Sequence, residues 1–132
     1  MEYGEVMQLK LIDGLPYSEV TIVYRNQNII VENVLVDTGS ASTIFSSDLM
    51  EKIGISPQPD DPLHTIRGVG GVEAVFSRSV DSVRLGSKEV HDIEIEIGGM
   101  DYGFKINGIL GMDILLKIGA IIDLKGLEIL FK

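Results

Sequence analysis

The sequence predicts an all-β domain with one or two short helices, spanning residues 1–132 as a single unit. Three observations lead to this fold class. Short segments rich in β-branched residues recur along the chain, turn-forming residues separate them, and no linker or fixed-period repeat interrupts the pattern. Apolar residues make up 45% and charged residues 23% of the chain, as in ordinary globular domains. A chain of this length can bury a hydrophobic core without crosslinks, and it contains no cysteine that could supply one.

In the first part of the chain, expected strands alternate with polar turns. The turn signals are the segments Asp13–Pro16 and Asn26–Asn28, and Val34–Val36 is a continuous apolar run of the kind buried on both faces of a sheet. A short helix is expected over Asp48–Ile53, because serine or aspartate can cap its start and a glycine follows its end. The strands expected before this helix are Val6–Ile12, Glu19–Tyr24, Ile29–Val31 and Val34–Val36.

The second part of the chain is expected to form three hairpins and one more helix. A glycine cluster, Gly68-Val69-Gly70-Gly71, lies at the tip of the first hairpin, Leu63–Phe76. The helix is expected over Asp113–Ile118, with a glycine at its carboxyl end. The remaining strands are expected over Ser79–Leu85, Val90–Ile97, Tyr102–Ile106, Ala120–Leu124 and Leu127–Phe131.

Charge and hydropathy argue against several classes of partner. The chain has 20 acidic and 11 basic residues, a net charge of −9, and its basic residues do not cluster, so nucleic acid is not an expected partner. No apolar run approaches the roughly 18–20 residues that cross a bilayer, and the first residues lack the apolar core of a secretory signal. The expected location is therefore the cytoplasm, without a membrane partner. His64 and His91 lie far apart, so neither a metal site nor a cofactor is expected.

The tetrapeptide Asp37-Thr38-Gly39-Ser40 stands out from this background. It directly follows the apolar run Val34–Val36, and an ionisable group at the end of a buried strand is unusual because an unpaired carboxylate is costly to desolvate. Two interpretations remain open from these residues alone. Asp37 either takes part in a reaction or caps a turn with its own backbone, as aspartates commonly do.

A second motif, Ile109-Leu110-Gly111, places two large apolar residues and a glycine ahead of the second expected helix. Together with Asp37–Ser40 and the glycine-tipped hairpin Leu63–Phe76, it resembles the pattern of the retropepsin-like aspartic proteases in order and spacing. The resemblance runs from about residue 20 to the end of the chain, and it is closest to proteases of the DNA-damage-inducible type and their bacterial relatives. It implies the closed β-barrel half-domain of the pepsin and retropepsin type. The implied flap of this half-domain carries Gly68, Val69, Gly70 and Gly71 at its tip.

The resemblance implies an aspartic endopeptidase in which Asp37 is the catalytic residue. Aspartic proteolysis uses two carboxyl groups that share one water and one proton. The ionised group removes a proton from the water, and the protonated group hydrogen-bonds the scissile carbonyl oxygen. The chain has one D-T-G, so one subunit holds half of such a site. Two copies related by a twofold axis complete it, which makes the expected partners a second copy of the chain and an extended peptide or protein substrate.

The resemblance also gives roles to the neighbours of Asp37. Thr38 is expected to hydrogen-bond across the dimer, the amide of Gly39 to donate to the carboxylate, and Ser40 to hydrogen-bond the outer oxygen of Asp37. The flap glycines are expected to let the flap open and close over a bound peptide. The hydrophobic–glycine loop of the family corresponds to Ile109, Leu110 and Gly111.

The chain departs from the viral members of the family in two places. Met112 follows Gly111 where the viral enzymes carry an arginine that braces the active-site loop, so a different brace, or none, is expected. The chain also ends in a hairpin, which puts a viral-style interleaved terminal sheet at the dimer interface in doubt. Asp113 is expected to cap the second helix rather than to take part in catalysis.

Two other functions remain compatible with the sequence. The same fold can serve as a non-catalytic module that binds extended peptides at a sheet edge or pairs with a second copy. It can also be a structural β-domain of a larger assembly, in which Asp37 only caps a turn. The intact D-T-G-S favours the endopeptidase, because a binding module has no use for a buried carboxylate.

Overall fold

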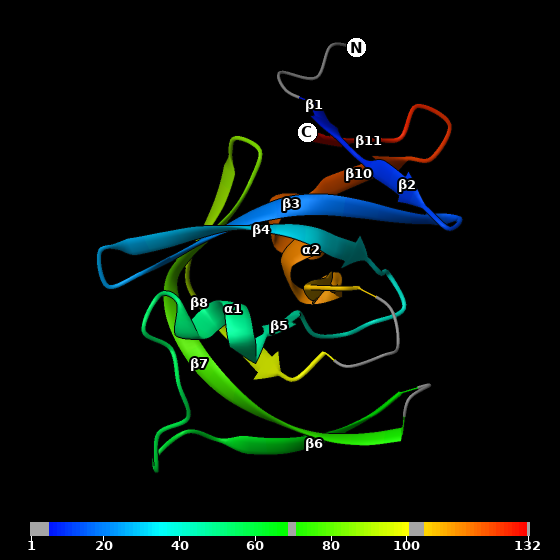
Figure 1. The fold of residues 1–132 in the computed structure, drawn as a ribbon. Helices are drawn as coiled ribbons and strands as arrows, with labels where there is room; N and C mark the ends of the chain where they lie inside the picture. The colour runs from blue at the N-terminus through cyan, green and yellow to red at the C-terminus, as the bar shows by residue number, and fades with distance from the viewer. Residues whose placement is uncertain (1–5, 69–70, 101–104, 132) are drawn as a thin grey trace.

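The computed structural model describes residues 6–68, 71–100 and 105–131, and Figure 1 shows how their elements are arranged. The helices are α1 (Ser47–Glu51) and α2 (Met112–Ile118). The strands are β1 (Val6–Gln8), β2 (Lys10–Ile12), β3 (Leu15–Tyr24), β4 (Gln27–Val36), β5 (Ile44–Ser46), β6 (Leu63–Gly68), β7 (Gly71–Leu85), β8 (Lys88–Gly98), β9 (Gly108–Leu110), β10 (Ala120–Asp123) and β11 (Glu128–Phe131). Neither helix is long and apolar enough to cross a membrane.

Six strands close into a barrel. They pair in the order β3, β4, β9, β5, β8 and β7, and pairing between β7 and β3 closes the ring. β2 extends the sheet beyond β3, and β6 extends it beyond β7, so the β6–β7 hairpin projects from the barrel (Figure 1). The all-β class and the closed barrel with a flap-like hairpin, both predicted from the sequence, are confirmed.

The pairing of β4 with β9 determines where the two sequence motifs lie. These strands are parallel, with Leu35 opposite Ile109 and Val36 opposite Leu110. The carboxyl ends of parallel strands lie at the same edge of a sheet. The residues that follow β4, beginning with Asp37, therefore lie beside the residue that follows β9, Gly111.

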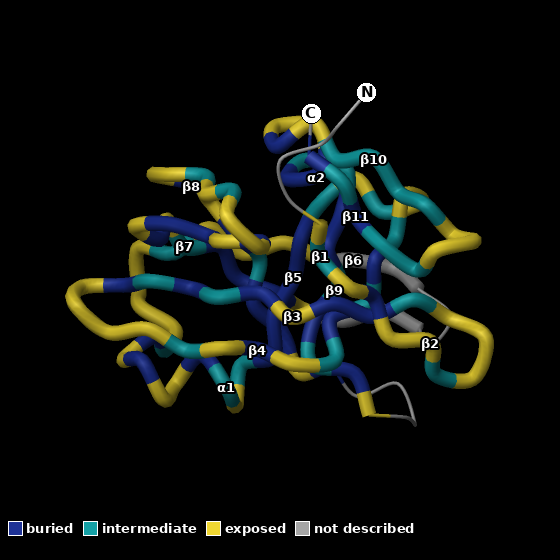
Figure 2. Tube along the Cα trace, turned by 90° about the horizontal axis from the view of Figure 1, so that it is seen from above, coloured by how far each residue is buried: buried dark blue, intermediate teal, exposed yellow. Residues whose placement is uncertain are grey.

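Two hydrophobic clusters form the core, and Figure 2 shows buried segments at the centre of the molecule with exposed turns around them. The larger cluster fills the barrel and packs α1 and α2 against it; its fully covered side chains include Phe45, Ile95 and Leu110. The smaller cluster consists of Tyr17, Ile44, Val75, Met100 and Ile106, with Ile12, Leu35 and Ile109 packed against it.

A separate three-stranded sheet joins the two ends of the described chain, with β11 between β1 and β10 (Figure 1). The closing hairpin is confirmed, but the expected single strand Val6–Ile12 is wrong. The chain changes sheets at Leu9, which is buried and donates its amide to the carbonyl oxygen of Leu127 over 2.7 Å. One half of the segment therefore pairs with β11 and the other half with β3.

Several predicted strands are longer in the structure than in the sequence pattern. The segments expected at Ile29–Val31 and Val34–Val36 are one strand, β4, which continues through Asn33 with a φ of +56°. β7 likewise runs through Ser77 and Arg78, although these polar residues interrupt the apolar pattern. In β4 the pairing with β3 shifts register between Val31 and Val34, so the chain remains one strand across an irregularity at Asn33. Ser77 and Arg78 lie within continuous pairing of β7 with β8, so ladder hydrogen bonds maintain the strand where the side-chain pattern breaks.

Two short strands differ from expectation, whereas the two helices differ only in their bounds. β5 was not predicted, because three buried residues are too short to show an alternating pattern. The expected strand Tyr102–Ile106 lies mostly outside the described residues, and its last two residues, Lys105 and Ile106, are not in a strand. Both helices are confirmed. α1 begins one residue and ends two residues before its expected bounds, and α2 is followed by the C-cap residue Gly119, which has a φ of +62°.

Candidate active site

Asp37 is positioned by the end of β4 and by its parallel neighbour β9. The amide of Asp37 donates to the carbonyl oxygen of Leu110 over 3.0 Å, so the first residue after β4 stays attached to the last residue of β9. Val36 is buried and Asp37 is half-buried. The strand thus ends in the core and presents the carboxyl group at the surface of the barrel.

The carboxylate of Asp37 accepts a hydrogen bond from its own loop. The amide of Gly39 donates to Oδ1 of Asp37 over 2.8 Å, as the sequence led us to expect. Thr38 and Gly39 are exposed in the single chain. The loop therefore orients one carboxylate oxygen and leaves its outer surface free to meet another molecule.

The expected role of Ser40 is wrong. Its hydroxyl donates to the carbonyl oxygen of Ser42 over 2.7 Å, and a serine hydroxyl has one proton to donate. The amide of Ser40 donates to the carbonyl oxygen of Asp37 over 3.2 Å, which closes the turn. Ser40 therefore stabilises the loop backbone and is not a donor to the Asp37 carboxylate.

The hydrophobic–glycine motif is partly a strand rather than a loop. Ile109 and Leu110 lie in β9, where Ile109 faces the smaller cluster and Leu110 is covered in the larger one. Gly111 follows and passes close to the Asp37 loop. A Cβ atom on Gly111 would lie 2.4 Å from the carbonyl oxygen of Ser42, closer than atoms can approach. This position accepts only glycine without a backbone shift.

Asp113 does not cap α2 in the expected way. The N-cap residue is Gly111, which has no side chain to cap the helix, and Asp113 lies in the first turn. Its carboxylate accepts from the amide of Ile114 and from both the amide and the hydroxyl of Thr43. Thr43 is fully buried and was not singled out from the sequence, because a single threonine after Ser42 belongs to no motif.

The β6–β7 hairpin corresponds to the predicted flap. Its strands pair from Leu63 opposite Phe76 to Gly68 opposite Gly71. The predicted tip residues Val69 and Gly70 lie outside the described residues. Val75 of β7 belongs to the smaller cluster, against which Leu35 of β4 and Ile109 of β9 pack. Apolar packing thus links the base of the hairpin to the strands that hold Asp37.

An ion pair that the sequence did not reveal joins the hairpin to the segment before it. Asp61 accepts from Nε and Nη2 of Arg78 at 2.9 and 2.6 Å, and Nη2 also donates to the carbonyl oxygen of Ser56. A third nitrogen of Arg78, Nη1, donates to the hydroxyl of Tyr24 over 3.1 Å. Hydrogen bonds from Arg78 lower the pKa of Asp61 below its ordinary value, and Asp61 in turn raises the pKa of Arg78.

No set of three or more histidine, aspartate or glutamate side chains gathers as a metal site within the part of the chain that the structure describes. The edge formed by β4 and β9 presents a carboxylate, backbone amides and hydroxyl groups.

Comparisons with known proteins agree with this arrangement. A family model described as "Aspartyl protease" matches residues 20–114, which include β4, the Asp37 loop, the β6–β7 hairpin and the start of α2. Among solved structures, the chain is similar to a retropepsin-like aspartic protease from Rickettsia conorii, with a TM-score of 0.67 and 22% sequence identity. That match covers 98% of this chain and 100% of the other. No curated protein sequence matches the chain significantly. On the family match and the shared retropepsin-like fold, the chain belongs to the aspartyl protease family.

Proposed function

We propose that the protein is a homodimeric aspartic endopeptidase that hydrolyses peptide bonds in extended polypeptide segments. The observation that carries the proposal is the position and hydrogen bonding of Asp37 in the single chain. The half-buried Asp37 has its carboxylate oriented by the amide of Gly39 and its own amide bonded to Leu110, and it lies beside the exposed residues Thr38 and Gly39. A residue that only capped a turn would not need the support of a second strand.

One carboxylate is not sufficient for this chemistry. Attack on a peptide carbonyl requires a base that removes a proton from water and an acid that hydrogen-bonds the carbonyl oxygen. Two Asp37 residues, one from each subunit, supply both roles when the pair holds a single proton. The water oxygen then bonds to the carbonyl carbon, and the leaving nitrogen takes up a proton as the C–N bond breaks.

The β6–β7 hairpin supports an extended polypeptide as the substrate class. β6 is the last strand in the order of the eight-stranded sheet, so its outer edge is available to the backbone of another chain. An extended peptide can add to such an edge through main-chain hydrogen bonds, whatever its sequence. The hairpin therefore suits a substrate that is held first by its backbone and then selected by its side chains.

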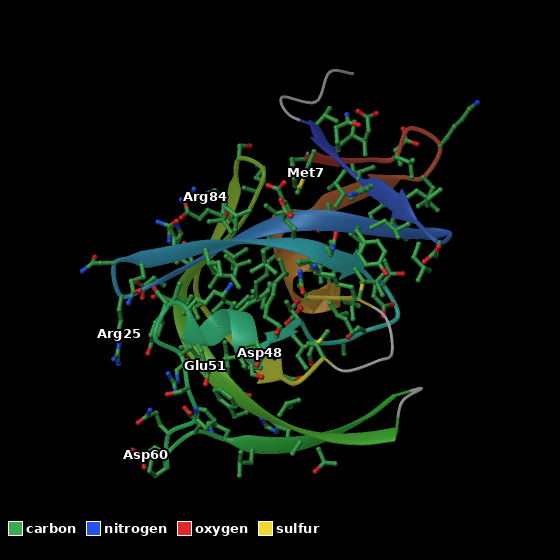
Figure 3. All side chains as sticks on the ribbon, in the orientation of Figure 1. Met7, Arg25, Asp48, Glu51, Asp60 and Arg84 are labelled. Carbon is green, nitrogen blue, oxygen red and sulfur yellow. The ribbon has the colours of Figure 1, made fainter. Side chains whose placement is uncertain are left out.

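The test measures cleavage of an unfolded protein by the wild type and by Asp37→Asn. We expect the wild type to cleave, with activity per chain falling on dilution as dimers dissociate, and Asp37→Asn to lose activity while it keeps its fold. Asp48→Asn is the matched control, because Asp48 is an exposed aspartate on α1 (Figure 3). Cleavage by Asp37→Asn, or equal activity per chain in a preparation that is monomeric by sizing, would refute the proposal. Binding of the unfolded protein without cleavage would instead identify a peptide-binding module.

A further inference from the structure

The Asp37 loop and the start of α2 are joined along their whole length. The amide of Met112 donates to the carbonyl oxygen of Ser40 over 2.8 Å, and the amide of Asp113 donates to that of Ala41 over 3.3 Å. With the bond from Asp37 to Leu110, these contacts place residues 37–43 against residues 110–113. The loop that carries the carboxylate is thus held by a second segment that is distant in sequence.

The join ends in hydrogen bonds between the buried Thr43 and the half-buried Asp113. The hydroxyl of Thr43 donates to Oδ1 of Asp113 over 2.7 Å, and the amide of Thr43 donates to Oδ2 over 3.2 Å. The same hydroxyl oxygen accepts from the amide of Gly111 over 3.0 Å. One threonine therefore connects the carboxylate of Asp113 with Gly111, which packs closely against the loop. We call this pair the Thr43–Asp113 latch.

Among the residues that the structure describes, Asp113 of the latch forms no ion pair. Met112, the first residue of α2, packs its side chain against the larger hydrophobic cluster. The carboxylate of Asp113 is instead satisfied by neutral donors, namely Thr43 and the amide of Ile114. Hydrogen bonds to an ionised acceptor are about twice as strong as those between neutral groups. A carboxylate with such donors can therefore hold a loop without an arginine.

We propose that Thr43 and Asp113 are positioning residues that fix the Asp37 carboxylate for catalysis; this inference rests on the proposed function. Neither residue touches the reacting atoms. They act by fixing the far end of the loop, so that Asp37 and Gly39 keep the geometry in which the amide orients Oδ1. A displacement of about 1 Å at a reacting group can lower a rate about 100-fold.

The main competing explanation is that Asp113 only stabilises the helix through its place in the first turn. The chain offers a matched control for this effect, because Asp48 lies in the first turn of α1 as Asp113 does in α2. A negative charge near a helix start is favourable in both places. Asp48 is exposed and lies on the other helix (Figure 3), whereas Asp113 accepts a hydrogen bond from Thr43.

The first experiment compares the kinetics of Thr43→Val, Asp113→Ala and Asp48→Ala in the full chain. We expect Thr43→Val and Asp113→Ala to lower kcat about 10–100-fold with little change in KM, because the carboxylates are displaced while the substrate surface stays intact. The double variant should lose little more than either single variant, since both remove one interaction. Thr43→Ser, which keeps the hydroxyl, should recover most of kcat, and Asp48→Ala should match the wild type. If Asp113→Ala does not fold, Asp113→Asn replaces it.

The second experiment does not depend on activity. Amide hydrogen exchange should become faster at Gly39, Ser40 and Met112 in Thr43→Val and Asp113→Ala, while core amides such as that of Ile95 keep their protection. If the wild type cleaves no peptide, the proposed function fails and exchange still decides whether the latch holds the loop. Either of two results refutes the latch. One is that folded Thr43→Val and Asp113→Ala both retain wild-type kcat, and the other is that both retain wild-type hydrogen exchange in the Asp37 loop. The latch is also refuted if Asp48→Ala lowers kcat as strongly as Asp113→Ala.

Discussion

The amide of Asp37 donates a hydrogen bond to the carbonyl oxygen of Leu110, 3.0 Å away. This bond continues the parallel pairing by one residue beyond the end of β4, with the last residue of β9 as the acceptor. The position of the carboxylate is therefore set by strand register as well as by its own loop. Changes near β9 and the start of α2 should consequently affect Asp37 although they lie far from it in sequence.

The first prediction concerns Gly111. In Gly111→Ala, the new methyl group would meet the carbonyl oxygens of Ser42 and Ser40 at 2.4 and 2.9 Å. We expect the backbone to shift, the free energy of unfolding to fall by about 1–3 kcal/mol, and kcat to fall because the Asp37 loop moves with it. Chemical denaturation and steady-state kinetics measure both effects.

Gly119→Ala is the control for this prediction, since Gly119 lies at the other end of α2. Its φ of +62° is unfavourable for alanine, but no atom lies within 4 Å of the added methyl group. We expect Gly119→Ala to lose stability while it keeps kcat. Equal losses of kcat in the two folded variants would contradict the prediction.

A second prediction follows from the hydrogen bond of Ser40. Because its hydroxyl donates to the carbonyl oxygen of Ser42, Ser40→Ala removes a bond within the loop and no donor from the Asp37 carboxylate. We expect a stability loss of about 1 kcal/mol and an acidic limb of the pH–rate profile that stays in place. An upward shift of that limb would show that Ser40 turns toward the carboxylate in the working enzyme.

The third prediction concerns the pH–rate profile of the wild type. A pair of carboxyl groups that shares one proton is inactive both when it loses that proton and when it gains a second. The profile should therefore be bell-shaped, with a maximum at roughly pH 4–6. Circular dichroism at each pH separates loss of the fold from loss of activity. A flat profile between mildly acidic and alkaline pH would argue against a shared proton.

The ion pair of Arg78 with Asp61 gives a fourth prediction, about stability. The pKa of Asp61 is lowered in the folded chain, chiefly by its hydrogen bonds with Arg78. The ionised pair therefore stabilises the fold above the ordinary aspartate pKa of about 3.9, and this contribution is lost as the pH falls through the lower, folded value. Asp61→Asn should be less stable than the wild type at neutral pH and should lose less stability on acidification.

Urea denaturation between about pH 2 and pH 7 measures this effect without screening charges. Asp60→Asn is the control, because Asp60 is the exposed neighbour of Asp61 in the turn before β6 (Figure 3). We expect Asp60→Asn to follow the wild-type dependence on pH. Parallel curves for Asp61→Asn and the wild type would show that the ion pair does not contribute to acid sensitivity.

Much of the fold could be predicted because its signals are local. Turn residues marked the hairpin ends, and glycines marked the end of α2 and the tip of the β6–β7 hairpin. The division of Val6–Ile12 between two sheets could not be predicted in the same way. Nothing in the alternation of this segment shows that Leu9 bonds to Leu127, because the partner lies at the other end of the chain.

In the site, too, the contacts between residues distant in sequence could not be predicted. The resemblance implied that the Gly39 amide donates to the carboxylate of Asp37, and the structure contains this hydrogen bond. Thr43 could not be singled out, since its role depends on being buried beside Asp113 after the two segments meet. The expected role of Ser40 was wrong for a related reason. The turn directs its hydroxyl toward Ser42, and only the folded loop shows which acceptor is nearer.

The position of β11 between β1 and β10 has a consequence for how subunits combine. Because these strands pair within one molecule, each copy can complete its own terminal sheet before it meets a second copy. Subunits of the proposed dimer should then exchange freely, and an Asp37→Asn chain should form mixed dimers with the wild type. Each mixed dimer holds one intact carboxylate and one amide in its shared site. An excess of the Asp37→Asn chain should thus inhibit the wild-type chain, although the fold and the stability of the wild-type chain are unchanged.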